Sequence, residues 1–352
     1  VVLKAWQRAR ERVPAVGLRV LLSEETYRSN EAILRELPAG VKLTYYHSLL
    51  TYSCSHRPMI EPAFEQWARQ GRWLGVTPQL SGDVGGATPF TGAAFARARM
   101  NEFVDKGVSG FTGYATPRLA HARFNVEAAA EWSWNAGGRT TREFALSYAV
   151  RHGIRHPETF AEWSETLGPV AWDVYGSEWP AGERRRSLTP VAEALRRGTL
   201  PGLGELTGGV YRKPWGDFHT PAQLRDDLAA AGRAVALARQ LGEPEYVQES
   251  LVIEAYAKTL CALWELKQVV GPQGIAAEGR ETAAKQFAAF LDGCEQAAGA
   301  LREWSRTVAP DIAPEPDSRY WKLLDVLGKC AKDMRGLAGD LGVELSAANG
   351  RR

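Results

Sequence analysis

The stretch LRVLLSEETYRSNEAILRELPAGVKLTYYHSLL, residues 18–50, decides the fold class. Its first six residues are an apolar run rich in β-forming side chains, and EAILREL after them has helical spacing. A Pro-Ala-Gly turn ends that helix, and VKLTYYHSLL at 41–50 is a second β-type run. A strand, a helix and a second strand in this order predict a βα unit in a parallel sheet.

The same alternation continues through the first 150 residues. Further β-type runs lie at 72–80 and 107–115, with helical stretches before and between them, EPAFEQWARQ and TGAAFARARMNEFVDKG. Strands of a parallel sheet are buried on both faces and read as apolar runs, as these do. We therefore predict an α/β domain over 1–150 that forms the last four units of a TIM-type (β/α)8 barrel.

Beyond residue 150 the pattern becomes helical. Residues 151–214 are helical and aromatic-rich and end in a Gly/Pro-rich connector, where turn chemistry dominates. In 215–352, apolar side chains recur at helical spacing in four long segments, 221–241, 245–270, 281–308 and 318–342. Such stripes predict an antiparallel, all-α helical bundle as a further domain.

Composition excludes several classes of partner. The formal net charge is +2, so neither a nucleic acid nor a membrane surface is expected as a partner. No apolar run is long enough to cross a bilayer, so we expect a soluble protein, cytoplasmic or exported. Walker A, G-x-G-x-x-G, G-x-S-x-G and H-E-x-x-H motifs are missing, and no cofactor is expected.

The four cysteines, Cys54, Cys261, Cys294 and Cys330, are scattered without C-x-x-C spacing, so no metal site is predicted. Three of them fall on apolar faces of the expected helices, where a free thiol behaves as a small hydrophobic side chain. Their redox state stays open.

Polar and aromatic side chains follow each predicted strand. They are Ser23-Glu24-Glu25, Tyr45-Tyr46-His47, the segment from Gln79 to Asp83, and Tyr114. Ligands bind at the carboxyl ends of parallel strands in barrels and open sheets. We therefore expect a binding cleft at this edge of the sheet.

Four carboxyl groups are candidates for catalysis: Asp83, Glu24, Glu25 and Glu131. Glycoside hydrolysis generally uses two carboxyls about 5–9.5 Å apart. Glu24 and Glu25 equally suit a capped helix start, and the Gly-rich GDVGGATPF around Asp83 equally suits an ordinary loop. These alternatives stay open.

Aromatic side chains indicate the substrate class. In AAAEWSWNAGGRTTREFA, residues 128–145, Trp132 and Trp134 alternate like the end of a strand, although the flanking residues read as helix. Aromatic faces pack against the C–H faces of sugar rings, and Trp and Tyr add a polar edge. A sugar-binding role and core packing are equally compatible with this pair, whereas Trp163, Trp172 and Trp179 are expected in the core.

Residues 130–135, AEWSWN, resemble the segment that closes the barrel before a helical domain in family 84 glycoside hydrolases. The chain is similar to the C-terminal half of hexosaminidase-type families 20 and 84, and to bacterial family 67 glucuronidase-like proteins. The resemblance implies a carbohydrate-active hydrolase in which Asn135 faces the sugar. It supplies no catalytic acids, because the family's Asp-Asp pair has no counterpart before the helical region. The pair Asp226–Asp227 falls in a predicted bundle helix and is not expected to replace it.

The full set of expected sugar contacts is Asn135, Trp134, Trp132, Asp83, Tyr46, His47 and Tyr114. The opening VVLKAWQRARERV reads as the middle of a helix, so we expect a fragment with its catalytic acids upstream. Its partners are then a carbohydrate substrate and either the missing N-terminal part of the chain or a second copy. The alternative is a non-catalytic carbohydrate-binding or scaffold protein that uses the bundle for partner contacts. Sugar, linkage and stereochemical outcome stay open.

Overall fold

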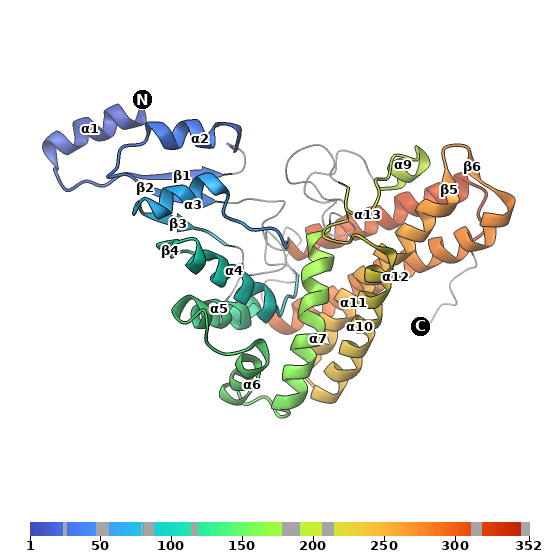
Figure 1. Cartoon of the computed structure of the whole chain (residues 1–352). Coiled ribbons are helices and arrows are strands. Elements are labelled where there is room, and N and C mark those ends of the chain that lie inside the picture. The colour runs from blue at the N-terminus through green and yellow to red at the C-terminus, as the bar shows by residue number, and fades with distance from the viewer. Residues whose placement is uncertain are drawn as a thin grey trace.

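A parallel sheet with its helices lies on one side of the molecule and a helical bundle on the other, and helix α7 (Pro157–Gly176) stands between them (Figure 1). The computed structural model describes residues 1–23, 27–46, 56–78, 80, 88–113, 119–177, 191–205, 215–310 and 319–345.

Four strands form the sheet: β1 (Arg19–Ser23), β2 (Lys42–Tyr46), β3 (Leu74–Val76) and β4 (Gly110–Phe111). They pair in chain order and all pairs are parallel, which confirms the predicted strand direction. Parallel neighbours need crossover helices, and here these are α2 (Tyr27–Glu36), α3 (Pro62–Arg69) and α4 (Ala93–Asp105). A further helix, α1 (Val2–Arg12), precedes β1.

The two faces of the sheet differ in burial. Tyr45 stacks on Phe64 of α3 with ring centroids 4.1 Å apart, so this face packs against helices. On the opposite face, Leu21 is 60% exposed although it sits in the middle of β1. The prediction of strands buried on both faces is therefore wrong for β1, whereas the register partner of Leu21 on β2, Thr44, is only 3% exposed. Four strands do not close into a barrel, since closure needs about eight, and a complete barrel is not confirmed.

Helices α5 (Leu119–Trp134) and α6 (Thr141–Arg151) follow β4. The expected strand end around 128–135 is wrong, because α5 is continuous through Trp134. A capping box starts α6: the Thr140 hydroxyl accepts from the Glu143 backbone N–H, and the Glu143 carboxylate accepts from the Thr140 backbone N–H.

The bundle contains the four predicted helices, α10 (Pro221–Leu241), α11 (Pro244–Val269), α12 (Arg280–Val308) and α13 (Arg319–Asp340). Caps delimit α10, which begins at a Thr220–Gln223 capping box and ends at Gly242 with φ 79°. The short α9 (Val191–Arg196) lies in the segment 151–214, which the sequence predicts to be helical. Not expected from the sequence are the two-residue strands β5 (Val270–Gly271) and β6 (Gly274–Ile275), and the single turn η2 (Ala277–Gly279).

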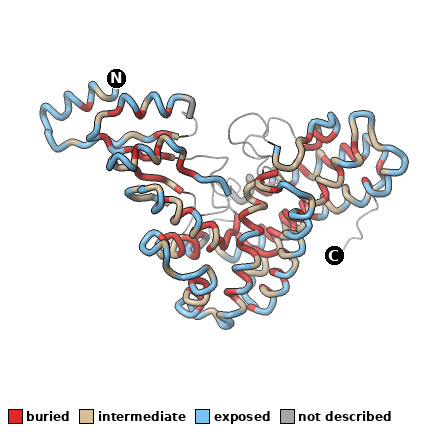
Figure 2. The backbone as a smooth tube through the Cα atoms, in the orientation of Figure 1, coloured by how far each residue is buried: buried red, intermediate tan, exposed pale blue. Residues whose placement is uncertain are grey.

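The buried residues run without a break from the sheet through α7 into the bundle (Figure 2). Trp163 of α7 is fully buried, and its Nε1 donates to Ser250 Oγ of α11 at 2.8 Å. Tyr175 Oη of α7 donates to the Pro89 carbonyl at 2.7 Å, just before α4. One core therefore fixes α7 against both parts, and the predicted core position of Trp163 is confirmed.

Cys294 and Cys330 are buried and Cys261 is half-buried. This confirms their predicted place on apolar helix faces; Cys54 lies outside the described residues. None of the described helices has a stretch long and apolar enough to cross a membrane.

Candidate functional site

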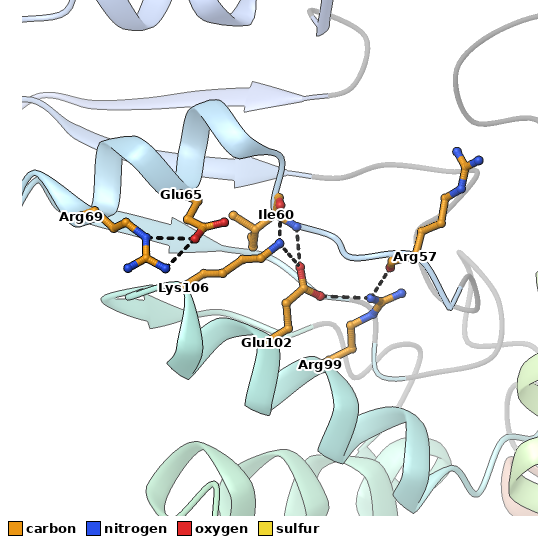
Figure 3. A network of polar contacts seen from close by, with 7 residues as sticks. All are labelled: Arg57, Ile60, Glu65, Arg69, Arg99, Glu102 and Lys106. Atoms are coloured by element: carbon orange, nitrogen blue, oxygen red, sulfur yellow. Dashed lines mark hydrogen bonds and ion pairs between the residues drawn. The ribbon is translucent and has the colours of Figure 1, made fainter.

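The connection that follows β2 carries His56, the first residue of the candidate site. Helix α4 holds the residues just after it (Figure 3). Glu102 Oε1 accepts from the Ile60 backbone N–H at 2.7 Å, and Arg99 donates to the Arg57 carbonyl at 2.7 Å. Lys106 Nζ donates to the Ile60 carbonyl at 2.6 Å, so three side chains of one helix fix this segment.

These three side chains also pair with one another. Arg99 lies 3.2 Å and Lys106 3.2 Å from the two carboxylate oxygens of Glu102, and Arg99 is only 3% exposed. Breaking a buried ion pair leaves an uncompensated charge, which is strongly unfavourable. The three side chains therefore keep one arrangement. In Figure 3 the Arg57 side chain extends away from Arg99, although its backbone carbonyl accepts the Arg99 hydrogen bond.

The C-terminal part of α7 contacts His56 directly. His56 Nε2 lies 2.6 Å from Asp173 Oδ1, and the imidazole stacks on Trp172 with centroids 3.8 Å apart and planes 14° apart. Trp172 is nearly buried, and its other side meets Phe95 of α4 edge-on at 5.6 Å. The stacking on Trp172 and the contact with the Asp173 carboxylate together fix the position and the orientation of the imidazole.

A tight turn before α10 completes the contacts to His56. Asp217 Oδ2 accepts from the His56 backbone N–H at 2.7 Å. The preceding Gly216 has φ 59°, and a Cβ there would lie 2.7 Å from the carbonyl carbon of Gly176 at the end of α7. Only glycine allows this approach, which brings Asp217 next to the end of α7.

Asp227 of α10 adds a second carboxyl beside Asp173. Burial raises the pKa of Asp227, and the charge of Asp173 and a side-chain hydrogen bond with it raise the pKa further. Asp226 makes a smaller contribution in the same direction. Two carboxyls in contact cannot both ionise easily, so the pair shares a proton near neutral pH.

The arrangement is a chain of a protonatable carboxyl, a carboxylate and an imidazole, from Asp227 through Asp173 to His56. His56 and Asp173 keep 41% and 28% of their side-chain surface exposed, so water and solutes reach this chain. A carboxyl kept neutral by its surroundings serves as a general acid, and its ionised neighbour serves as a base or as a charge stabiliser. The described residues include no group of three or more His, Cys, Asp or Glu side chains placed to hold a metal ion.

Most of the predicted strand-end residues cannot be compared with this site. Glu24, Glu25, His47, Asp83 and Tyr114 lie outside the described residues. Tyr46 ends β2, opposite Ser23 of β1, and is half-buried. Its predicted role toward sugar stays a prediction.

The residues from the WSWN segment lie apart from the strand ends. Helix α5 starts after β4 and is 16 residues long, so it spans about 24 Å from end to end. Trp132 is fully buried and its Nε1 donates to the Arg139 carbonyl at 3.0 Å, so the prediction that it stacks on a sugar is wrong. Trp134 is 92% exposed, and Glu131 pairs with Arg139 at 3.3 Å. A sugar contact by Trp134 or Asn135 and a catalytic role for Glu131 are untested.

Sequence reasoning missed His56, Asp173 and Asp217, since nothing in the chain marks them. The adjacent acids Asp226 and Asp227 are visible in the sequence, but a bundle helix is not where the sequence predicts a catalytic site. The structure places Asp227 next to the end of α7 and its Asp173, where a bundle helix meets the connection after β2.

No family model and no curated sequence matches the chain. Its structure is similar to that of a GH138 enzyme targeting pectin rhamnogalacturonan II, with a TM-score of 0.58 and 11% sequence identity. The match covers 95% of this chain and 57% of that chain, so the chain spans little more than half of that enzyme's length. At this identity the likeness is one of fold. The fold is thus glycoside hydrolase-like, but the match does not support the hexosaminidase or glucuronidase families named above.

Proposed function

We propose that the chain is part of a carbohydrate-active glycoside hydrolase whose acid–base group is the Asp227–Asp173 pair. The observation that carries this proposal is the contact between two carboxyls, Asp227 and Asp173, next to an exposed imidazole. The fold likeness to a GH138 enzyme supports a carbohydrate as the substrate class. A carboxyl whose surroundings raise its pKa is the kind of group that protonates a glycosidic oxygen.

In the proposed reaction, Asp227 is the acid that gives its proton to the glycosidic oxygen as the C–O bond breaks. Asp173 lies within hydrogen-bond distance of His56 Nε2, at 2.6 Å from its Oδ1. Its charge favours the positive charge that develops on the sugar carbon in the transition state. Water then adds to that carbon and returns a proton to Asp227, so one glycosidic bond and one water give two hydroxyl groups.

Replacement of single carboxyls tests the proposal. We expect Asp227→Asn to lower kcat on a cleaved glycoside by at least roughly 100-fold, the usual contribution of a general acid. Asp226→Asn on the same helix is the matched control, because Asp226 is exposed, and it should stay within about twofold of wild type. Reducing-end release from pectic oligosaccharides and a panel of chromogenic glycosides are the substrates.

Substrate binding is measured alongside turnover, because the chain spans 57% of the similar enzyme. Trp172 packs against His56, so saccharide binding should change tryptophan fluorescence, and Trp172→Phe should remove part of that change. An active wild type with an equally active Asp227→Asn would contradict the assignment of the acid. A folded chain that neither cleaves nor binds any saccharide of the panel would contradict the substrate class.

A further inference from the structure

A small cavity lies where α11 meets α5, α6, α7 and α12. Its volume is ≈70 Å³, and two carboxyl side chains of α11, Glu245 and Glu249, reach its wall. Aromatic rings make up most of the remaining wall: Phe90, Phe124, Tyr148, Phe160, Tyr246 and Trp304. The described residues of the lining include no Lys, Arg or His.

The rings contact one another and so hold the cavity open in one shape. Tyr148 meets Phe124 edge-on at 4.9 Å and stacks on Phe160 at 5.8 Å, measured between centroids. Tyr246 continues the wall, with its centroid 5.4 Å from that of Phe160. Aromatic faces carry negative partial charge and attract cations within about 6 Å.

The two carboxyls are one helical turn apart, so they point to the same side of α11. Glu249 is 5% exposed and is fixed by Thr91: its Oε1 accepts from the backbone N–H at 2.7 Å and its Oε2 from the hydroxyl at 3.1 Å. Glu245 and Tyr246 are half-buried and form the rim. The cavity therefore has an open mouth and a carboxyl at its closed end.

No positively charged side chain among the described lining residues would offset a negative charge on Glu245 or Glu249. Burial raises the pKa of Glu249 to about 8 against the lowering effect of Thr91, and Glu245 raises it slightly further. Burial and the charge of Glu245 raise the pKa of Tyr246 as well. Burial therefore favours the protonated form of Glu249, and no described lining residue carries a positive charge that would offset this.

Charged groups on the other helices add no positive charge to the described lining of the cavity. Burial and the charge of Glu127 raise the pKa of Tyr148 to about 12, against smaller lowering effects from Arg123 and Arg151. Those two arginines are exposed and act from α5 and α6, outside the lining. Helices α7 and α12 contribute uncharged side chains, Phe160, Trp304 and Val308.

We propose that this aromatic, two-carboxyl cavity is a binding site for a small organic ammonium group, such as a primary amine on a short alkyl stem. The volume equals that of about two water molecules in the liquid, which suits methylammonium and excludes a sugar ring. Calcium or magnesium is a poor fit, since these ions need six or more oxygen ligands. The proposal is independent of the hydrolase function.

Calorimetric titration with methylammonium chloride at constant ionic strength tests the site. Binding should be roughly tenfold tighter at pH 9 than at pH 7, because the carboxylate form of Glu249 binds the cation. At pH 7, heats measured in buffers of different ionisation enthalpy should reveal release of about one proton per amine bound. Potassium chloride and tetramethylammonium chloride should give no comparable heat.

Matched variants of α11 make the test specific. Glu249→Gln should weaken binding at least tenfold and abolish the proton release, whereas Glu254→Gln, on the same helix outside the cavity, should leave both unchanged. Far-UV circular dichroism verifies the fold, and if Glu249→Gln fails to fold, Glu245→Gln must weaken binding at least fivefold. Absence of binding by folded wild type at about 50 mM amine would overturn the proposal. Equal binding by the cavity variants, or equal binding of potassium, would overturn it too.

Discussion

Asn125 holds together the connection between β3 and α4, and its replacement by alanine gives the sharpest stability prediction. The side chain is fully buried in α5. Its Nδ2 donates to the carbonyls of Leu80 at 2.7 Å and Phe90 at 2.9 Å, and its Oδ1 accepts from the Gly92 backbone N–H at 2.8 Å. One amide thus satisfies three backbone groups of the chain before α4.

Asn125→Ala leaves these three buried groups without their partner. A buried polar group that loses its hydrogen bond costs about 1–3 kcal/mol. The space left by the amide admits a water molecule, which restores part of the bonding, so the lower end applies to each group. We therefore expect the free energy of unfolding to fall by about 3–4 kcal/mol.

Urea unfolding at pH 7, followed by tryptophan fluorescence and circular dichroism, measures this loss. Thr307→Ala is the control: its hydroxyl is exposed and donates to the Glu303 carbonyl at 2.9 Å, so the change should stay within about 0.5 kcal/mol. Asn125→Asp keeps the acceptor, loses both donors and adds a charge facing two carbonyls, so it should destabilise more than alanine. A loss below about 1 kcal/mol in Asn125→Ala would refute the reasoning.

Single contacts give three further predictions. The pKa of Glu249 is raised to about 8 in the folded chain, so Glu249 binds its proton more tightly there than in the unfolded chain. The free energy of unfolding should therefore fall as the pH rises from 5 to 8, by up to about 1.4 kcal/mol per pH unit. Glu249→Gln should flatten that pH profile in urea titrations; an unchanged slope would contradict the assignment. Trp132→Phe should cost about 2 kcal/mol, because it deletes a buried hydrogen bond and leaves a void, whereas the same change at the exposed Trp134 should cost less than about 0.5 kcal/mol. Gly216→Ala should lower stability by at least about 1 kcal/mol and change the NMR chemical shifts of the His56 imidazole, because a Cβ at φ 59° meets the end of α7; wild-type chemical shifts would argue against that contact.

The sequence determined the elements whose signals are local. Apolar β-type runs indicated β1 and β2, and their alternation with helices indicated parallel pairing before any contact was known. Helical spacing predicted a helix at 221–241, which is where α10 lies. These features depend on neighbours within a few positions, so the sequence suffices for them.

The alternation of Trp132 and Trp134 misled the sequence reasoning for a physical reason. Two positions two apart share one face of a strand, whereas on a helix they face nearly opposite sides, and a pattern of three residues is too short to distinguish the two. The choice fell to tertiary packing, which buries Trp132 against Phe144 of α6 with ring centroids 5.1 Å apart. A pattern this short therefore did not decide between strand and helix.

The candidate site belongs to the tertiary structure alone. His56 lies 117 residues from Asp173 and 161 residues from Asp217, and each stands in a local context that is ordinary for a loop or a helix. The adjacent acids at 226 and 227 were visible, but their chemistry arises from the burial of Asp227 and the charge of Asp173. Local sequence therefore determined where the helices and strands begin and end. Which acid keeps its proton was decided by the packing of α7, α10 and the connection after β2, because desolvation and charge act through space and not along the chain.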